Sequence, residues 1–369
     1  MSSPTIETNI MEPTLISQAG HCHALVSALT CAYPKGKEHC RVWTHRDLAA
    51  HSLSPSEVRR VFSRRARHIQ VANRVARSLR HQQVVLSTAT TTDLLGIHLL
   101  KPIGIRRPGS LVLYMHWYGP KPRKDRFMRR FFKRHPGVVV LAPSRSTVDH
   151  LSSLGAKRIA VVEYPFAGLR ERAAASATRT PTSPPAIIVA GAARMDKGLP
   201  ISVDLIECLS RDNRTIDVRI QASPTHWGDV KPDVAIELSR LQGIGYQHLV
   251  QEDRTLTDQH FREFIRDGIA MLPYDATAFS DRVSAVAIDA LVEGSPIVTT
   301  KGTWMAGLVE RFDAGIVVEG SDALAWRNAV DTICSDWHAY RNKALDAATA
   351  LAPIHHPRHF WDAIERLSQ

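Results

Sequence analysis

Two acids stand eight residues apart where a polar loop runs into a helical pattern. Asp281 lies in the loop, and Asp289 lies within 283–293, whose apolar residues have helical spacing. The first N–H groups of a helix have no partner within it, so those of Ser284 and Ala285 could bind an anion. Asp289, one to two turns into the helix, could accept hydrogen bonds from a neutral diol such as a ribose.

A second set of candidate residues is cationic. The segment 187–209 has the pattern of a strand, a turn of small residues and a helix, with Arg194 and Lys197 in the turn. Small residues let a ligand approach the backbone, and the start of a helix favours an anion. Neither G-x-G-x-x-G nor G-x-x-x-x-G-K-[ST] is present. The segment therefore favours a diphosphate pocket of another kind, with an ordinary solvated turn as the alternative.

Strand and helix patterns alternate along the chain, which predicts an α/β fold of parallel sheets covered by helices. In the first half the expected strands are 14–17, 83–87, 111–117, 138–144 and 159–165, and the expected helices are 23–29 and 58–79. In the second half the expected strands are 186–192, 218–223, 248–252, 269–274, 296–300 and 314–320, and the expected helices are 199–210, 233–241, 258–266, 283–293 and 304–311.

A length of 369 residues favours two domains. We expect a flexible tail at 1–12, a Rossmann-like domain at 13–170, a linker at 171–185, a second Rossmann-like domain at 186–350, and an amphipathic C-terminal helix in 351–369 that packs back on the first domain. Parallel sheets bind ligands outside the carboxyl ends of their strands. Two such domains would therefore place a ligand in a cleft that they share.

Positive charge is concentrated in the first half of the chain. Residues 1–170 hold 27 Lys and Arg against 9 Asp and Glu, whereas the remainder holds 20 against 27. Within 121–135, Phe127, Phe131 and Phe132 share one helix face that cations surround. This pattern predicts docking on an anionic membrane, with phenylalanines that face the core as the alternative. No nucleic-acid-binding motif accompanies the charge, so no nucleic-acid partner is expected.

Several features point to a cytoplasmic protein, peripheral to the inner face of the membrane if it docks there. No apolar run reaches the roughly 20 residues of a membrane span. The N-terminus lacks the apolar region of a secretory signal. The five cysteines are odd in number and fit no zinc or C-x-x-C spacing, so we expect reduced thiols. The His and Cys residues of 21–40 also lack the usual spacing of metal ligands, and no metal is expected.

Residues 187–320 resemble the donor-binding domain of retaining GT-B glycosyltransferases, which include glycogen and sucrose synthases and many bacterial polysaccharide enzymes. The family turn G-R-x-x-x-x-K-G corresponds to GAARMDKG, in which Arg194 stands two places later than usual. The family block P-S-x-x-E-x-x-x-x-x-x-x-E-A-x-A-x-G-x-P corresponds to LPYDATAFSDRVSAVAIDALVEGSP, in which Asp281 and Asp289 replace both glutamates. The family segment G-G-x-x-E is kept loosely in KGTWMAGLVE, as Gly302 and Glu310.

The first half resembles the family's acceptor domain more weakly. Gly20 and His21 follow the first expected strand, where the family often has a glycine-rich turn that reaches the donor phosphates. His116 ends another expected strand, where the family often has a histidine near the reacting sugar. The alternative for His116 is a histidine satisfied in the core.

The resemblance implies two Rossmann-like domains that face a cleft, and transfer of a sugar from a nucleotide diphosphate sugar to a hydroxyl of a glycan or lipid-linked acceptor, usually with retention. It implies no metal or other cofactor. His116 and Asp281 would be catalytic, and the donor would contact Gly20, His21, Arg194, Lys197, Tyr274, Arg282, Ser284, Ala285 and Asp289. A GT-B-related nucleotide-sugar epimerase and a non-catalytic nucleotide-sugar-binding homologue are the alternatives.

Overall fold

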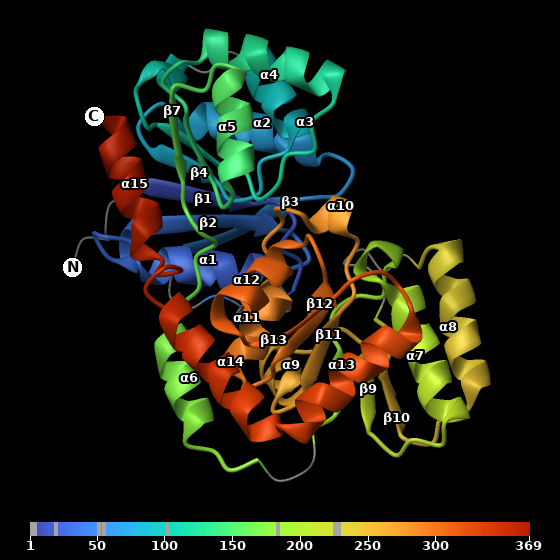
Figure 1. Cartoon of the computed structure of the whole chain (residues 1–369). Helices are drawn as coiled ribbons and strands as arrows, with labels where there is room; N and C mark the ends of the chain where they lie inside the picture. The colour runs from blue at the N-terminus through green and yellow to red at the C-terminus, as the bar shows by residue number, and fades with distance from the viewer. Residues whose placement is uncertain are drawn as a thin grey trace. The chain divides into compact units, whose positions relative to one another are not determined.

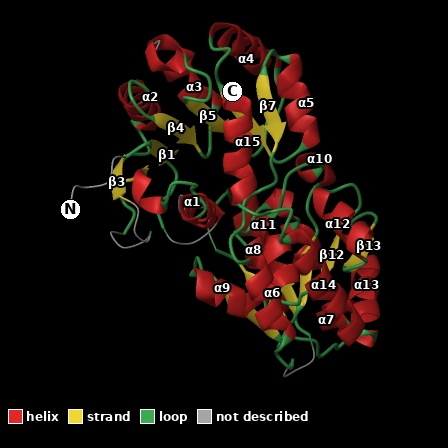
Figure 2. Cartoon of the chain, turned by 90° about the vertical axis from the view of Figure 1, so that its left-hand side faces the viewer, coloured by secondary structure: helices red, strands yellow, loops and turns green. Residues whose placement is uncertain are grey.

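The chain forms two compact α/β units in a computed structural model (Figure 1). The structure describes residues 6–17, 21–49, 53, 57–100, 103–181, 185–223 and 230–369. The first unit comprises Met1–Ala167 and Ile354–Gln369, and the second comprises Gly168–Pro353. In each unit helices flank a parallel sheet (Figure 2). Within the described residues, no helix is both long and apolar enough to cross a membrane.

The first unit is built on a parallel seven-stranded sheet. Its strand order is β3-β2-β1-β4-β5-β6-β7. The strands are β1 (Thr8–Glu12), β2 (Cys40–His45), β3 (Glu57–Phe62), β4 (Gln83–Leu86), β5 (Leu111–Tyr114), β6 (Val139–Ala142) and β7 (Arg158–Val161). The helices of this unit are α1 (His21–Cys31), α2 (Arg67–Ser78), α3 (Thr91–Leu100), α4 (Pro122–Arg134), α5 (Arg145–Ser153) and α15 (Arg358–Ser368).

The first strand lies inside the expected flexible tail, so that expectation was wrong for 8–12. All five residues of β1 are buried, whereas the expected strand at 14–17 is turn and loop. Polar side chains are tolerated in β1 because each is paired across the sheet. Asn9 Oδ1 accepts a hydrogen bond of 2.7 Å from the Trp43 indole, and Asn9 Nδ2 donates one of 2.7 Å to Gln82 Oε1.

The expected helix at 58–79 is correct only in its second part. Its first residues form the edge strand β3, which pairs with β2, and α2 begins at Arg67. Arg41 of β2 forms an ion pair with Glu57 at 2.7 Å, while Arg59 and Arg60 are exposed. An edge strand accepts such charged positions because one side faces solvent.

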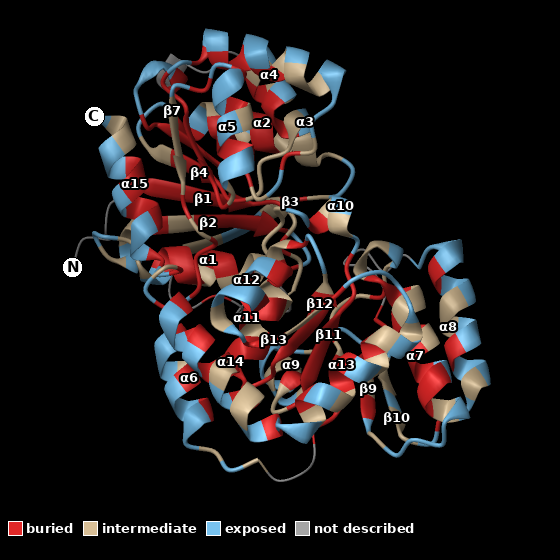
Figure 3. Cartoon of the chain, in the orientation of Figure 1, coloured by how far each residue is buried: buried red, intermediate tan, exposed pale blue. Residues whose placement is uncertain are grey.

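Helix α4 buries the apolar face that we expected to be available to a membrane. Met128 and Phe131 are fully buried, Phe132 is 2% exposed, and Phe127 is half-buried. Figure 3 shows that α4 carries both buried and exposed stretches. These side chains pack in one core with apolar residues of α2, α3 and α5 and of the sheet. The apolar residues of 121–135 therefore face the core, and only the cationic face of α4 is exposed.

The second unit is built on a parallel six-stranded sheet, and every strand and helix expected in it is present. Its strand order is β10-β9-β8-β11-β12-β13. The strands are β8 (Ile187–Val189), β9 (Val218–Gln221), β10 (Leu249–Glu252), β11 (Ile269–Leu272), β12 (Ile297–Thr300) and β13 (Gly315–Val318). The helices are α6 (Leu169–Ala177), α7 (Leu199–Arg211), α8 (Pro232–Ile244), α9 (Asp258–Ile265), α10 (Ala276–Phe279), α11 (Ala285–Val292), α12 (Trp304–Phe312), α13 (Ala323–Ser335) and α14 (Trp337–Leu351).

Helix α6 occupies 171–177, which we expected to belong to a linker. It is part of the second unit, and its residues Leu169, Ala173 and Ser176 are buried. The helix is held by ion pairs of Arg172 to α11. The small residues of this segment suggested a linker. They form a helix because they pack against a partner surface that lies more than 100 residues away in sequence.

Candidate functional site

Three cations and one acid gather at the carboxyl ends of β8 and β11 in the second unit. Arg194 donates from Nε to Asp196 Oδ1 at 2.7 Å, and Arg282 Nη1 lies 3.9 Å from Asp196 Oδ2. Lys197 Nζ lies 5.5 Å from the centre of the Tyr274 ring. All of these side chains are partly accessible except that of Tyr274. Asp281 also acts on the charge of Arg282, so three cations face two carboxylates, and the remaining positive charge favours an anion.

Two glycines bring backbone and cation close together in this cluster. Gly191 has φ +102°, and a Cβ there would lie 2.7 Å from Lys197 Nζ and 3.9 Å from Val286 Cγ2. Gly198 has φ +72°, and a Cβ there would lie 1.9 Å from the carbonyl oxygen of Pro273. Only glycine adopts these conformations without strain. The turn after β8, the end of β11 and the first turn of α11 thus meet around Lys197.

The N-terminus of α11 faces this turn. Ser284 is the N-cap, and its buried hydroxyl accepts a hydrogen bond of 3.3 Å from the N–H of Ala287. The hydroxyl is therefore engaged in capping the helix, whereas the N–H groups of Ala285 and Val286 are the first of the helix. Both of these residues are half-buried. The start of α11 thus lies near Gly191 and Lys197.

Tyr274 and Phe279 form an aromatic side of this neighbourhood. Tyr274 is 3% exposed, packs against Phe279 at 4.6 Å between ring centres, and has a buried hydroxyl without a hydrogen-bond partner among the described residues. The Arg282 guanidinium lies 4.5 Å over the Phe279 ring. Burial and the nearby Arg194 lower the pKa of Arg282. Asp281 precedes Arg282 in the loop and is half-buried.

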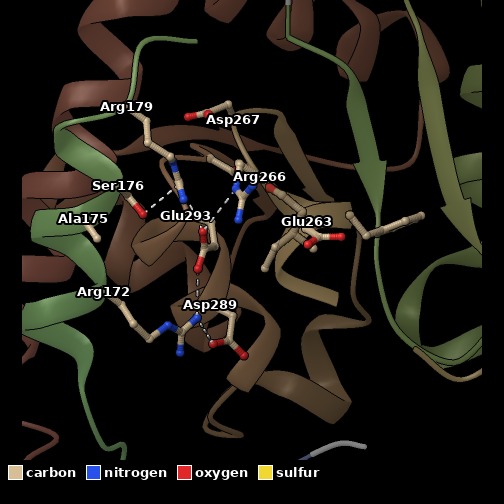
Figure 4. A network of polar contacts seen from close by, with 12 residues as sticks. Arg172, Ala175, Ser176, Arg179, Glu263, Arg266, Asp267, Asp289 and Glu293 are labelled. Carbon is tan, nitrogen blue, oxygen red and sulfur yellow. Dashed lines mark hydrogen bonds and ion pairs between the residues drawn. The ribbon is translucent and has the colours of Figure 1, made fainter. Parts of the chain in front are cut away.

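Asp289 lies on α11 but is tied to α6 (Figure 4). Its Oδ1 lies 2.9 Å from Nη2 of Arg172, and one-fifth of its side chain is exposed. Burial raises the pKa of Asp289, and Arg172 opposes that rise. The pKa of Arg172 is itself raised, because Asp289 and Glu293 outweigh the effect of burial. A ribose at this carboxylate would have to share it with Arg172.

Glu293 is the centre of the polar network in Figure 4, and no sequence pattern singles it out. Its side chain is 4% exposed and lies 3.3 Å from Arg172, 3.1 Å from Arg179 and 3.7 Å from Arg266. Arg341 extends the network, because it binds Asp267 at 2.8 Å and donates to the backbone carbonyl of Ser176. The network joins α6, α11 and α14, so its first role is structural.

His116 of the first unit is held by a neighbouring strand. Its Nε2 lies 2.5 Å from the carbonyl oxygen of Ser87, and because a carbonyl can only accept, this nitrogen carries the proton. The ring packs edge-on against Tyr114 and Tyr164. Ser87 in turn donates from Oγ to Glu12 Oε2 at 2.8 Å. His116 is thus anchored by its contact with the backbone directly after β4.

Two acids near these clusters were not singled out from the sequence. Asp196 stands between Arg194 and Lys197, and its position within that cationic turn could have marked it. Glu12 is fully buried and accepts hydrogen bonds from Thr14, Ser87 and Thr88, and it closes a strand that we did not expect. Only the long-range pairing of β1 with β4 explains why an acid can be buried there.

The remaining expected donor contacts cannot be placed. Gly20 lies outside the described residues, and His21 begins α1 with a side chain that is likewise outside them. Within the described part of the chain, no group of three or more His, Cys, Asp and Glu side chains is arranged to hold a metal ion.

Comparison with known proteins gave matches in structure only. No protein-family model matches the sequence. No curated protein matches it either. Among solved structures, Anabaena HepE in complex with UDP and glucose is 16% identical, with a TM-score of 0.70 over 99% of this chain and 100% of that one. Sucrose-phosphate synthase from Thermosynechococcus elongatus is 13% identical, with a TM-score of 0.68 over 97% and 96%.

A UDP-forming α,α-trehalose-phosphate synthase from Burkholderia xenovorans is 11% identical, with a TM-score of 0.67 over 99% of this chain and 100% of that one. This chain has the GT-B fold. The match extends over both units, including the first, for which the sequence resemblance was weak. The GT-B fold confirms the expected α/β architecture of two Rossmann-like units. At sequence identities this low, a structural match supports the fold but does not indicate the substrate.

Proposed function

We propose that the chain is a glycosyltransferase that moves a sugar from a nucleotide diphosphate sugar to the hydroxyl of a glycan or lipid-linked acceptor, with retention. The observation that carries the proposal is the meeting of Lys197, the Gly191 turn and the N-terminus of α11 at the carboxyl edge of the second sheet. HepE, which shares the GT-B fold, was solved with UDP-glucose. UDP is therefore the first probe for this chain.

The diphosphate would bind at the cationic side of this site, around Lys197. Lys197 and the N–H groups of Ala285 and Val286 would bind its oxygens, and Arg194 and Arg282 would turn towards it from Asp196. As the bond to the sugar breaks, negative charge builds on the leaving phosphate, and fixed cations and N–H groups stabilise that charge. The cations replace the charge that a metal would supply, so the proposed reaction is metal-independent.

The other expected contacts complete the proposal. Asp289 would accept from the ribose while Arg172 keeps it charged. Asp281, Arg282 and the buried hydroxyl of Tyr274 would contact the donor sugar. His116 would border the acceptor, with its Nε2 proton held by Ser87. A nucleotide-sugar epimerase and a non-catalytic binder are the alternatives, and the aspartates at 281 and 289, in place of the family's glutamates, are the feature that bears on a binder.

A binding and turnover experiment tests the proposal. A thermal-shift panel of UDP, ADP, GDP and their sugars is expected to give stabilisation by one nucleotide family, of roughly 2.7 kcal/mol at 100 times the Kd. Lys197→Ala should abolish it, and Lys301→Ala, at an exposed lysine paired with Glu319, should leave it intact. Release of free nucleotide from the bound donor then separates an enzyme from a binder. Equal or absent shifts in all three proteins would contradict the proposal.

A further inference from the structure

One surface of the first unit combines exposed aliphatic side chains with arginines. Ile69 of α2 is 70% exposed, and Leu95, Leu99 and Leu100 of α3 are 45%, 68% and 48% exposed. Leu95 and Leu99 are four residues apart, so they share one helix face, opposite the buried Asp93, Leu94 and Ile97. The outward face of α3 is therefore apolar, although nothing in the core requires it.

Helices α2, α3 and α4 bring these residues together. Gly96 of α3 packs against α2, where a Cβ would lie 2.9 Å from the Cβ of Ala72. On the other side, His98 of α3 packs against Phe127 and Phe131 of α4, at 5.8 and 6.1 Å between ring centres. The three helices thus form one continuous layer, and its outer surface includes the exposed residues of α2 and α3.

Helix α4 gives this layer its charge. Seven of its thirteen residues are Lys or Arg, against the single acid Asp125, which Tyr118 and His150 engage. Its exposed cations are Arg123, Arg126, Arg129, Arg130, Lys133 and Arg134. The only acid of α2 and α3, Asp93, is buried between Arg67 and His68. The outer face of these three helices therefore has many cations and no exposed acid.

We propose that the outer face of α2, α3 and α4, termed here the α2–α4 face, docks on the surface of an anionic lipid bilayer. Leu95, Leu99, Leu100 and Ile69 would enter the interfacial layer of the bilayer, while the arginines of α4 would lie among the headgroups. The face has both components that such binding needs, apolar area and positive charge. Phenylalanines of α4 play no part, because they are in the core.

Lipid fits this face better than nucleic acid does. A phosphate backbone would use the arginines but would leave the leucines and Ile69 exposed to water, because single strands are bound by aromatic stacking and cations. No aromatic side chain of α2 or α3 is available for stacking, since those helices carry none apart from histidines. The aliphatic residues are thus the feature that distinguishes the two partners.

Vesicle flotation tests the proposal, and it does not depend on the sugar-transfer reaction. The full chain is mixed with vesicles of phosphatidylcholine alone or with roughly one-third phosphatidylglycerol, at low and high salt. The variants are Leu95→Ser with Leu99→Ser, and Arg126→Gln with Arg130→Gln. The matched controls are Ile236→Ser, at an exposed residue of α8, and Arg170→Gln, at an exposed residue of α6.

We expect binding to the anionic vesicles only, weakened by salt. Each double variant should lower the bound fraction at least about tenfold, and the controls should bind as the wild type does. Urea unfolding of all variants checks that each is folded. Equal binding to both vesicle types, or unchanged binding by the leucine variant, would overturn the proposal. Binding of a mixed-sequence RNA that depends on the arginines but not the leucines would assign the face to nucleic acid and overturn it as well.

Discussion

The two arginine clusters of the second unit are made of the same residue types but differ in the burial of their central carboxylate. Around Glu293, three arginines meet two carboxylates, and the central acid is 4% exposed. Around Asp196, Arg194 and Arg282 meet a carboxylate that is itself 33% exposed. The central acid of the first cluster is closed to water, although Arg179 and Arg266 at its edge are 31% and 38% exposed. The second cluster leaves both its acid and its cations accessible to solvent or a ligand.

This difference separates a network that holds helices together from one that can bind. A buried charge is tolerated only with partners, so removing one partner from the Glu293 network leaves an uncompensated ion. A partly exposed cation is solvated, so its removal changes stability little. The same substitution should therefore act on folding in one cluster and on ligand binding in the other.

The largest expected effect is that of Glu293→Ala. It would leave Arg172, Arg179 and Arg266 without their shared acid, and we expect a loss of about 3–5 kcal/mol in the free energy of unfolding. Urea unfolding of the second unit measures this loss. Glu319→Ala, at an acid whose side chain is 80% exposed, should change the same quantity by less than about 0.5 kcal/mol. Similar effects of the two substitutions would remove the distinction between the clusters.

Arg172→Met should make stability depend on pH through Asp289. Burial already raises the pKa of this acid above its unfolded value, so its contribution is most favourable at low pH and is lost as pH rises through the folded pKa. Without Arg172 the folded pKa rises further, and the loss extends to neutral pH. We expect the variant to lose about 2–3 kcal/mol relative to the wild type at pH 7 and clearly less near pH 5. Nearby Asp258 and Arg262 have smaller, opposing effects.

Urea unfolding at both pH values, for the wild type and Arg172→Met, provides the measurement. Arg170→Gln, on the exposed face of the same helix, is the matched control and should show no such pH dependence. A loss for Arg172→Met that is equal at both pH values would mean that Arg172 acts through packing alone.

Lys197→Ala should affect binding and leave folding nearly unchanged. Loss of the lysine beside Gly191 removes one full charge from the proposed diphosphate site, and we expect UDP to bind at least about tenfold more weakly. Isothermal titration gives the affinity, and urea unfolding should show a change below about 0.5 kcal/mol. A destabilised variant with normal affinity would mean that Lys197 stabilises the fold, as Arg172 does, and does not bind the ligand.

Asp196→Asn is expected to have the smallest effect, and in contrast to Lys197→Ala it should strengthen UDP binding. In the ligand-free protein Asp196 engages Arg194 and lies near Arg282, so it competes with a diphosphate for both. Its neutralisation should tighten UDP binding by roughly threefold to tenfold. Weaker binding by the variant, measured by the same titration, would show that Asp196 positions the arginines for the ligand instead of competing with it.

The sequence predicted the second unit well because its strands are short apolar runs separated by helical patterns and turn residues. It predicted β1 to β3 poorly because their polar residues are stabilised by partners far along the chain. Asn9 binds Gln82, and Glu12 binds Ser87. No local sequence pattern indicates such long-range pairing, so a strand that contains Asn and Glu is predicted as a loop.

Within the candidate site, the sequence identified cations and a helix start but not their partners. Helical spacing showed that the phenylalanines of α4 share a face, but it could not show that the face is buried. Spacing likewise marked Asp289 as unusual on an apolar helix, whereas its partner Arg172 lies 117 residues earlier. Contacts between distant segments are set by the fold as a whole, so they required the structure.

A crystal structure of the chain with UDP would test the central claim most directly. We predict that oxygens of the β-phosphate lie within about 3.2 Å of Lys197 Nζ and of the N–H groups at the start of α11, with Arg194 released from Asp196. A diphosphate bound elsewhere on the chain, with Lys197 and α11 unchanged from the ligand-free arrangement, would contradict the account.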